Sequence, residues 1–134
     1  MAETSGMAEL ERLEKAREVL LRALERKAED PVVLDVREVS SFADTFVVLT
    51  GRSDRQVCAI ADAVEAGLRS AGERALGVEG YREGRWVLLD FTDLIVHVFQ
   101  REVREHYDLE RLWSDAPRID LGIAVDTETT GTSP

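Results

Sequence analysis

The chain has 134 residues, of which 44% are hydrophobic and 33% are charged, and its formal net charge is -10. This length and mixture suit one globular domain with a modest core. The acidic balance argues against broad contact with a phosphate backbone, because nucleic-acid-binding proteins usually present clustered positive charge. A basic protein partner fits the charge better, so we expect little direct contact with nucleic acid.

The single cysteine, Cys58, excludes an intrachain disulfide and a cysteine cluster for a metal, which favours a cytoplasmic setting. No apolar run approaches the length of a membrane span, and the first residues lack the pattern of a signal peptide. We predict a short disordered lead over residues 1–6, a single domain over 7–117 and a disordered tail over 118–134. The end of that tail is rich in Thr, Gly and acidic residues.

Two amphipathic helices are predicted, because apolar residues recur at helical spacing over residues 7–28 and again over 53–71. The second helix opens with Ser53 and Gln56 in the pattern of a capping box, in which each side chain bonds the backbone of the other residue. Gly72 is the expected end of this helix.

Short apolar runs predict strands over residues 32–36, 45–50 and 75–78. The longest apolar run, residues 86–99, is rich in β-branched and aromatic residues, which favour strands. Thr92-Asp93 interrupts this run in the middle. We therefore predict two antiparallel strands joined by a tight hairpin.

The predicted order of elements is α-β-β-α-β-β-β-α, with short helical segments at residues 101–107 and 109–113. One strand–helix–strand crossover predicts one parallel, right-handed pair of strands, and the other neighbours should be antiparallel. The expected fold class is α/β (α+β), with a mixed sheet and helices packed mainly on one face.

Both faces of the predicted hairpin are apolar, so both need cover. Trp86, Leu88 and Asp90 share one face of its first strand, and His97 and Phe99 share one face of its second. We expect the helices of the chain to cover one face. The face that carries Trp86, Asp90 or His97 is available to a partner.

Asp90, Asp93 and His97 lie close in sequence around the hairpin. A carboxylate and an imidazole that face each other can act as acid and base or hold a metal. A third ligand or a nucleophile is not evident, so a hydrogen-bonded structural pair is the favoured interpretation. We expect no catalytic residue, no metal and no cofactor.

Gly51-Arg52-Ser53 follows a strand and opens a helix, where free amides can hold a phosphate. A similar Gly-Ser pair precedes two metal-binding carboxylates in nucleotidyltransferases, but those carboxylates are missing here. Helix capping explains the motif better. A nucleotide-binding or nucleotidyltransferase-type enzyme remains the alternative function.

An ordered series of residues runs from the first helix to about Ala116: Asp35, Ser40, Ala43-Asp44, Phe46, Gly51, Ser53, Arg55-Gln56, Ile60-Ala61-Asp62, Glu79-Gly80, Trp86-Val87-Leu88-Leu89-Asp90, Asp93, His97-Val98-Phe99, Tyr107, Leu109-Glu110 and Leu112-Trp113. This series resembles the ribosome silencing factor family (Iojap-like). Thr92 stands where that family usually has Gly.

The resemblance implies a nucleotidyltransferase-like fold without the catalytic carboxylates. It implies binding to the large ribosomal subunit through the ribosomal protein of the uL-fourteen family, on the face that meets the small subunit. Occupying that face would block subunit joining and repress translation, notably when nutrients are scarce. Members of the family are often homodimers when free.

Aromatic anchors ringed by polar groups are typical of protein interfaces. On this basis the expected partner-binding residues are Glu79, Trp86, Leu88, Asp90, Asp93, His97 and Trp113. For Trp113, a place in the core and a place in the interface are equally compatible with the sequence.

Overall fold

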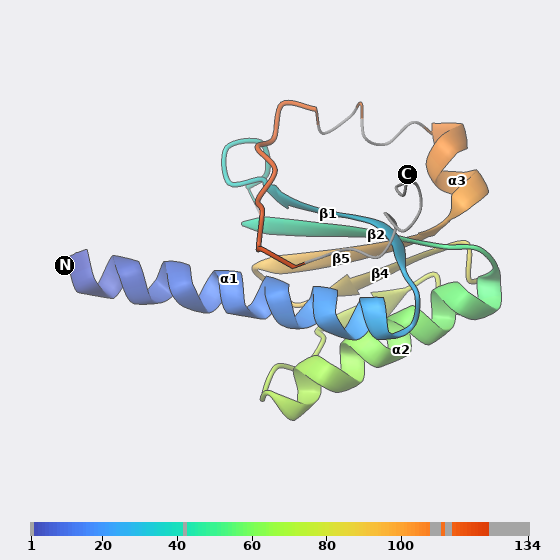
Figure 1. Cartoon of the computed structure of the whole chain (residues 1–134), viewed down its shortest axis with the longest axis horizontal. Helices are drawn as coiled ribbons and strands as arrows, with labels where there is room; N and C mark the ends of the chain where they lie inside the picture. The colour runs from blue at the N-terminus through green and yellow to red at the C-terminus, as the bar shows by residue number, and fades with distance from the viewer. Residues whose placement is uncertain (1, 42, 108–110, 112–113, 124–134) are drawn as a thin grey trace, which may run out of the picture.

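The computed structural model describes residues 2–41, 43–107, 111 and 114–123 (Figure 1). Five strands and the helices around them form the fold. The elements are α1 (Ala2–Glu25), β1 (Glu29–Asp35), β2 (Thr45–Gly51), α2 (Asp54–Ser70), β3 (Gly77–Glu79), β4 (Trp86–Asp90), β5 (Leu94–Gln100) and α3 (Arg101–Tyr107). The predicted helical segment at 109–113 lies almost wholly outside the described residues.

The strands form one mixed sheet in the order β1-β2-β5-β4-β3. β2 and β5 are parallel, and the other three neighbouring pairs are antiparallel. The predicted α/β class, the presence of one parallel pair and the hairpin of β4 and β5 are confirmed. The crossover prediction gave β2 the strand directly after α2 as its parallel partner, and this is wrong: β2 pairs with β5, and β3 lies at the far edge beside β4. The crossover between the parallel strands contains α2, β3 and β4, so β5 is the last strand in the chain but lies in the middle of the sheet.

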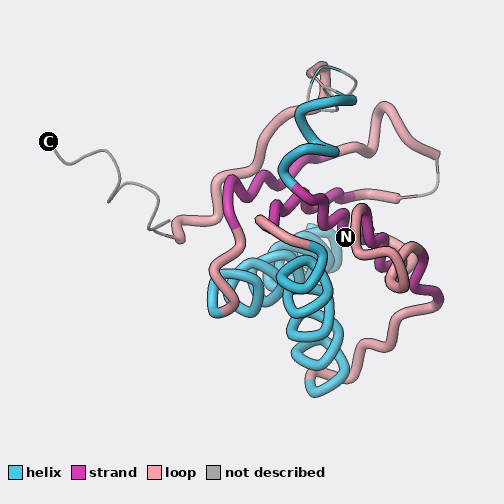
Figure 2. The backbone as a smooth tube through the Cα atoms, turned by 90° about the vertical axis from the view of Figure 1, so that its right-hand side faces the viewer, coloured by secondary structure: helices cyan, strands magenta, loops and turns pink. Residues whose placement is uncertain are grey.

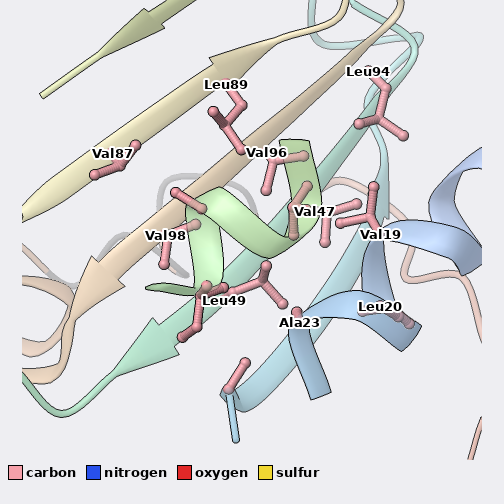
Figure 3. Packing of buried hydrophobic residues seen from close by; sticks show 14 of the residues in the cluster. Val19, Leu20, Ala23, Val47, Leu49, Val87, Leu89, Leu94, Val96 and Val98 are labelled. Atoms are coloured by element: carbon pink, nitrogen blue, oxygen red, sulfur yellow. The ribbon is translucent and has the colours of Figure 1, made fainter. Parts of the chain in front are cut away.

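Helices α1 and α2 lie side by side on one face of the sheet, and the short α3 lies on the other (Figures 1 and 2). Figure 3 shows Val19 and Ala23 of α1 packing toward Val47 and Leu49 of β2. These side chains are fully or almost fully buried. Each fully buried Val or Leu contributes about 1.5–3 kcal/mol, so this layer supplies most of the hydrophobic stabilisation.

Helix α1 differs from its predicted range at both ends. It begins at Ala2, inside the predicted lead, and ends at Glu25 instead of Ala28. The early end has a local cause, since Lys27 has a φ of 66° and the amide of Ala28 donates to the carbonyl of Ala23. This left-handed cap stops the helix. No helix in the described part of the chain has both the length and the apolar character to cross a bilayer.

Residues 118–123, which the sequence analysis placed in a disordered tail, pack along the outer edge of β1. The amide of Asp35 donates to the carbonyl of Pro117, and the amide of Ile119 donates to the carbonyl of Val33, both at 2.8 Å. Ile119, Leu121 and Ile123 are half-buried against the core. The predicted boundary at 117 therefore differs from the structure, while residues 124–134 lie outside the described range.

Candidate partner-binding surface

On the face opposite α1 and α2, cross-strand pairing lines the side chains up in rows. Going from β3 to β1, the central row contains Glu79, Leu88, His97, Val48 and Val32. Trp86 and Phe99 lie in the row on one side, and Asp90 and Ile95 lie in the row on the other. The alternation of faces that the sequence predicted for the hairpin is confirmed.

The two halves of this face are covered differently. Val103 of α3 and Ala116 pack over the half that β1 and β2 form. Toward β3 and β4, Trp86 is 37% exposed and Tyr107 is 57% exposed, with 6.3 Å between their ring centroids. We call the exposed part of this face the open patch; it consists of Glu79, Trp86, Leu88, Asp90 and Tyr107.

Backbone shape and ring packing fix the position of Trp86. Gly80 has a φ of 80°, and a Cβ atom there would lie 2.0 Å from the carbonyl oxygen of Trp86. Only glycine allows this close turn before β4. The indole packs against Phe99 at an interplanar angle of 43° with 4.8 Å between centroids, and its Nε1 donates to Nδ1 of His97 at 3.2 Å. The Trp86 side chain, the aromatic anchor of the open patch, is therefore held in place before any partner binds.

His97 lies beneath the open patch and is only 5% exposed. Its ring meets the edge of Phe46 at a centroid distance of 4.9 Å. Burial lowers the pKa of His97 from 6.5 to about 4, so the imidazole is neutral at pH 7. A neutral ring can accept the hydrogen bond from Trp86 at Nδ1. His97 is thus placed to support the anchor, below the surface that a partner would touch.

Asp90, Asp93 and His97 do not converge on one site. Asp90 lies opposite Ile95, and its Oδ1 accepts from the amide of Thr92 at 2.9 Å. Asp93 binds Nζ of Lys15 at 2.8 Å, toward α1. Within the described residues no three His, Cys, Asp or Glu side chains are grouped so that they could hold a metal. Trp113 lies outside the described residues.

The start of α2 forms the predicted capping box. Oγ of Ser53 accepts from the amide of Gln56 at 3.1 Å, and Oε1 of Gln56 accepts from the amide of Arg52 at 2.6 Å. Nε2 of Gln56 also donates to the carbonyls of Arg26 and Lys27, which ties the two long helices together. Two of the amides that a phosphate would need are already bonded within the chain.

A groove of about 930 Å³ lies on the other side of the molecule, between the first half of α1 and the end of α2. Arg12, Lys15 and Arg37 line it, and each forms ion pairs with carboxylates of the chain. These cations are engaged in holding α1 against the turns of the sheet. The groove therefore offers no free cation to a substrate among these three.

Tyr107 belongs to the open patch, although the sequence analysis did not place it among the partner-binding residues. It stands at the end of α3, a helix that starts directly after β5. A large aromatic residue at the end of a short, mostly charged helix was the available signal. Tyr107 lies near Trp86 because α3 folds back over the sheet. The sequence pattern does not predict the direction in which this helix packs.

Comparison with known proteins places this fold in a family. The family described as "Ribosomal silencing factor during starvation" matches residues 9–133. The chain belongs to this family. The resemblance drawn from the sequence is thereby confirmed.

Individual members of the ribosomal silencing factor family agree with this placement. The chain is 41% identical over 102 residues to "Ribosomal silencing factor RsfS" of Bacillus subtilis, covering 76% of the chain and 86% of the relative. It is 34% identical over 102 residues to the chloroplastic protein Iojap of Zea mays, covering 74% of the chain and 43% of that protein. A crystal structure of a Chromobacterium violaceum protein superposes with a TM-score of 0.74 at 32% identity, covering 87% of this chain and 97% of the other.

Proposed function

We propose that this protein is a ribosomal silencing factor that binds the large ribosomal subunit and sterically blocks its association with the small subunit, which represses translation under nutrient limitation. The observation that carries the proposal is membership of the family over residues 9–133. The open patch supplies a surface suited to this role, because a fixed, partly exposed aromatic anchor with carboxylates beside it suits a basic protein partner.

The proposed contact on the large subunit is the ribosomal protein of the uL-fourteen family. A protein whose net charge is -10 can approach a ribosome by docking on a basic ribosomal protein. Glu79 and Asp90 border Trp86 and Leu88 on the open patch, which gives the surface an apolar centre and an acidic rim. A cytoplasmic ribosome is the expected target, and a homodimer is the expected form of the free protein.

An enzymatic role receives less support from the geometry. The capping box occupies amides at the start of α2, and Asp90, Asp93 and His97 each have separate partners. Nucleotidyl transfer needs carboxylates that converge on a metal, and the described residues bring no such group together. We therefore propose that the protein acts by obstruction and has no catalytic turnover.

The decisive experiment is sedimentation of the purified protein with isolated large and small subunits. We expect the protein to pellet with large subunits only and to reduce the yield of joined ribosomes as its concentration rises. Light scattering of the free protein tests the homodimer. Equal binding to both subunits, or binding to neither, would rule out the proposed function.

A further inference from the structure

The seventeen lysines and arginines of this acidic chain are not all engaged. Most of them form ion pairs or hydrogen bonds, such as Arg22 with Glu18 and Arg69 with Glu65. Seven exposed cations have no ion pair or side-chain hydrogen bond with any described residue: Arg26, Lys27, Arg55, Arg74, Arg82, Arg85 and Arg118. These unpaired cations are unevenly distributed over the molecule.

Five of the seven lie at one end of the sheet, where α1 ends, α2 begins and the turn before β4 packs (toward the right of Figure 1). Two contacts show that these segments adjoin. Gln56 donates to the carbonyls of Arg26 and Lys27. A Cβ atom on Gly84 would lie 2.7 Å from Cβ of Asp54. We call this surface, formed by Arg26, Lys27, Arg55, Arg82 and Arg85, the basic end.

Nearby carboxylates do not neutralise the basic end. Glu29 binds both Arg52 and Arg101, and Arg101 also binds Asp30. Glu25, the last residue of α1, pairs with Arg22. Asp54 and Glu83 are the other acidic residues within the three segments. Exposed like charges repel one another, so five of them with so few counter-charges favour an anionic partner that offers several charges at once.

We propose that the basic end binds the phosphate backbone of ribosomal RNA next to the protein-docking site. The inference rests on the proposed function, because the ribosome is the partner that offers protein and RNA on one surface. Arg85 immediately precedes Trp86 in the chain, so the basic end lies at the end of the sheet where the open patch begins. Exposed arginines suit phosphates because the guanidinium can form two parallel hydrogen bonds to one phosphate. A strongly acidic chain, with a net charge of -10, can thus still contact RNA at one local basic surface.

The test compares the salt dependence of binding to large subunits for the parent protein and for a triple variant, Arg55→Gln, Arg82→Gln and Arg85→Gln. Affinity falls as salt rises, and each lost phosphate contact makes the slope of log affinity against log salt shallower by about 0.7–0.9. We expect the slope of the triple variant to be shallower by about 2. We also expect this variant to bind more than tenfold more weakly at low salt. The matched control is Arg74→Gln with Arg118→Gln, the two unpaired cations away from the basic end, which should leave the slope unchanged.

None of the five side chains has a partner among the described residues, so both multiple variants should fold. Thermal melting of each variant checks this. An unchanged slope in the triple variant, or an equal decrease in the control, would overturn the assignment.

A second arm separates this inference from the proposed function. The protein is titrated with large-subunit ribosomal RNA stripped of its proteins and, in parallel, with poly-glutamate. Binding to RNA that the triple variant loses supports the basic end even if intact subunits are not bound. No binding to RNA overturns it. Binding to poly-glutamate as tight as to RNA would also overturn it, in favour of an acidic protein partner.

Discussion

Thr92 in the turn between β4 and β5 has a φ of 79°. This left-handed conformation strains a β-branched residue by about 1 kcal/mol or more. The side chain is exposed, and the backbone amide is held by Asp90. The strain therefore comes from the Cβ atom and serves no contact that the structure shows.

We expect Thr92→Gly to raise the free energy of unfolding by about 1 kcal/mol, because glycine adopts this conformation without a steric penalty. The gain is reduced by the greater freedom of glycine in the unfolded chain. Urea unfolding measures the change. Thr92→Ala keeps the Cβ atom and should gain much less, so an equal gain from both variants would contradict this explanation.

His97 gives stability a pH dependence. Its pKa is about 4 in the fold and near 6.5 in the unfolded chain, so between these values the unfolded chain binds more protons. The contribution of His97 is fully present above pH 6.5 and is lost as the pH falls toward 4. The largest loss is about 3 kcal/mol. Chemical unfolding at a series of pH values measures it.

His97→Gln should flatten the stability profile between pH 6.5 and 4, at the cost of lower stability at pH 7. His106 is exposed at the end of α3, so His106→Gln serves as the matched control and should leave the profile unchanged. A profile that keeps its slope after His97→Gln would assign the pH dependence to other groups.

At the scale of elements, the segment after Pro117 protects an edge. β1 is the outermost strand, and residues 118–123 bond its free side and partly bury three aliphatic side chains. An uncovered edge strand is a template for pairing with other chains. This segment therefore contributes to solubility as well as to stability.

We expect truncation after Pro117 to lower the free energy of unfolding by about 2–3 kcal/mol, through lost burial and a lost backbone hydrogen bond. It should also promote aggregation. Truncation after Ile123 should change neither property, because the composition of residues 124–134 does not favour a packed segment. Melting curves and light scattering of the two truncated proteins provide the comparison. Equal stability would show that the edge needs no cover.

The sequence predicted the elements well where the pattern was local. Alternation along β4 and β5 predicted which side chains face the helices, and Ser53 with Gln56 predicted the start of α2. Residues 118–123 were missed although Ile119, Leu121 and Ile123 alternate as in a strand. These residues are held in place by the free edge of β1, and that edge exists only in the folded protein. The early end of α1 was missed because a left-handed cap at a lysine has no clear sequence signal.

For the molecule as a whole, the open patch determines the binding prediction. Tyr107 is the more exposed of its two aromatic residues, while Trp86 also packs on Phe99 and bonds His97. We expect Tyr107→Ala to weaken binding to large subunits with little change in melting temperature. Trp86→Ala should weaken binding by about 2 kcal/mol, roughly 30-fold, and should also lower stability.

Sedimentation with large subunits and thermal melting measure both effects. Leu10→Ala is the control, since Leu10 is an exposed apolar residue on α1, away from the open patch. Normal binding by both folded aromatic variants would move the interface elsewhere. Trp113, which the sequence analysis also proposed, would then be the next residue to test.

Alternation along the strand predicted that Trp86, Leu88 and Asp90 share one face, and the structure confirms it. The position of Glu79 beside Leu88 comes from the pairing of β3 with β4, which the sequence did not predict. Sequence reasoning could not place His97 and Asp93 correctly within that surface. The register of the hairpin sets Leu88 opposite His97, and the turn directs Asp93 toward Lys15 of α1. Register follows from the geometry of one turn, and a shift of one residue changes every cross-strand neighbour. Partner binding by these residues stays a prediction.

The central position of β5 has a consequence for folding during synthesis. A ribosome releases α1, β1 and β2 first, yet β2 and β4 are joined only through β5, the last strand to be made. A nascent chain that ends before about Gln100 therefore contains the two halves of the sheet without the strand that joins them. Long-range pairing of this kind is slow and must await the complete segment. The sheet, and with it the open patch, can therefore form only after β5 has left the ribosome.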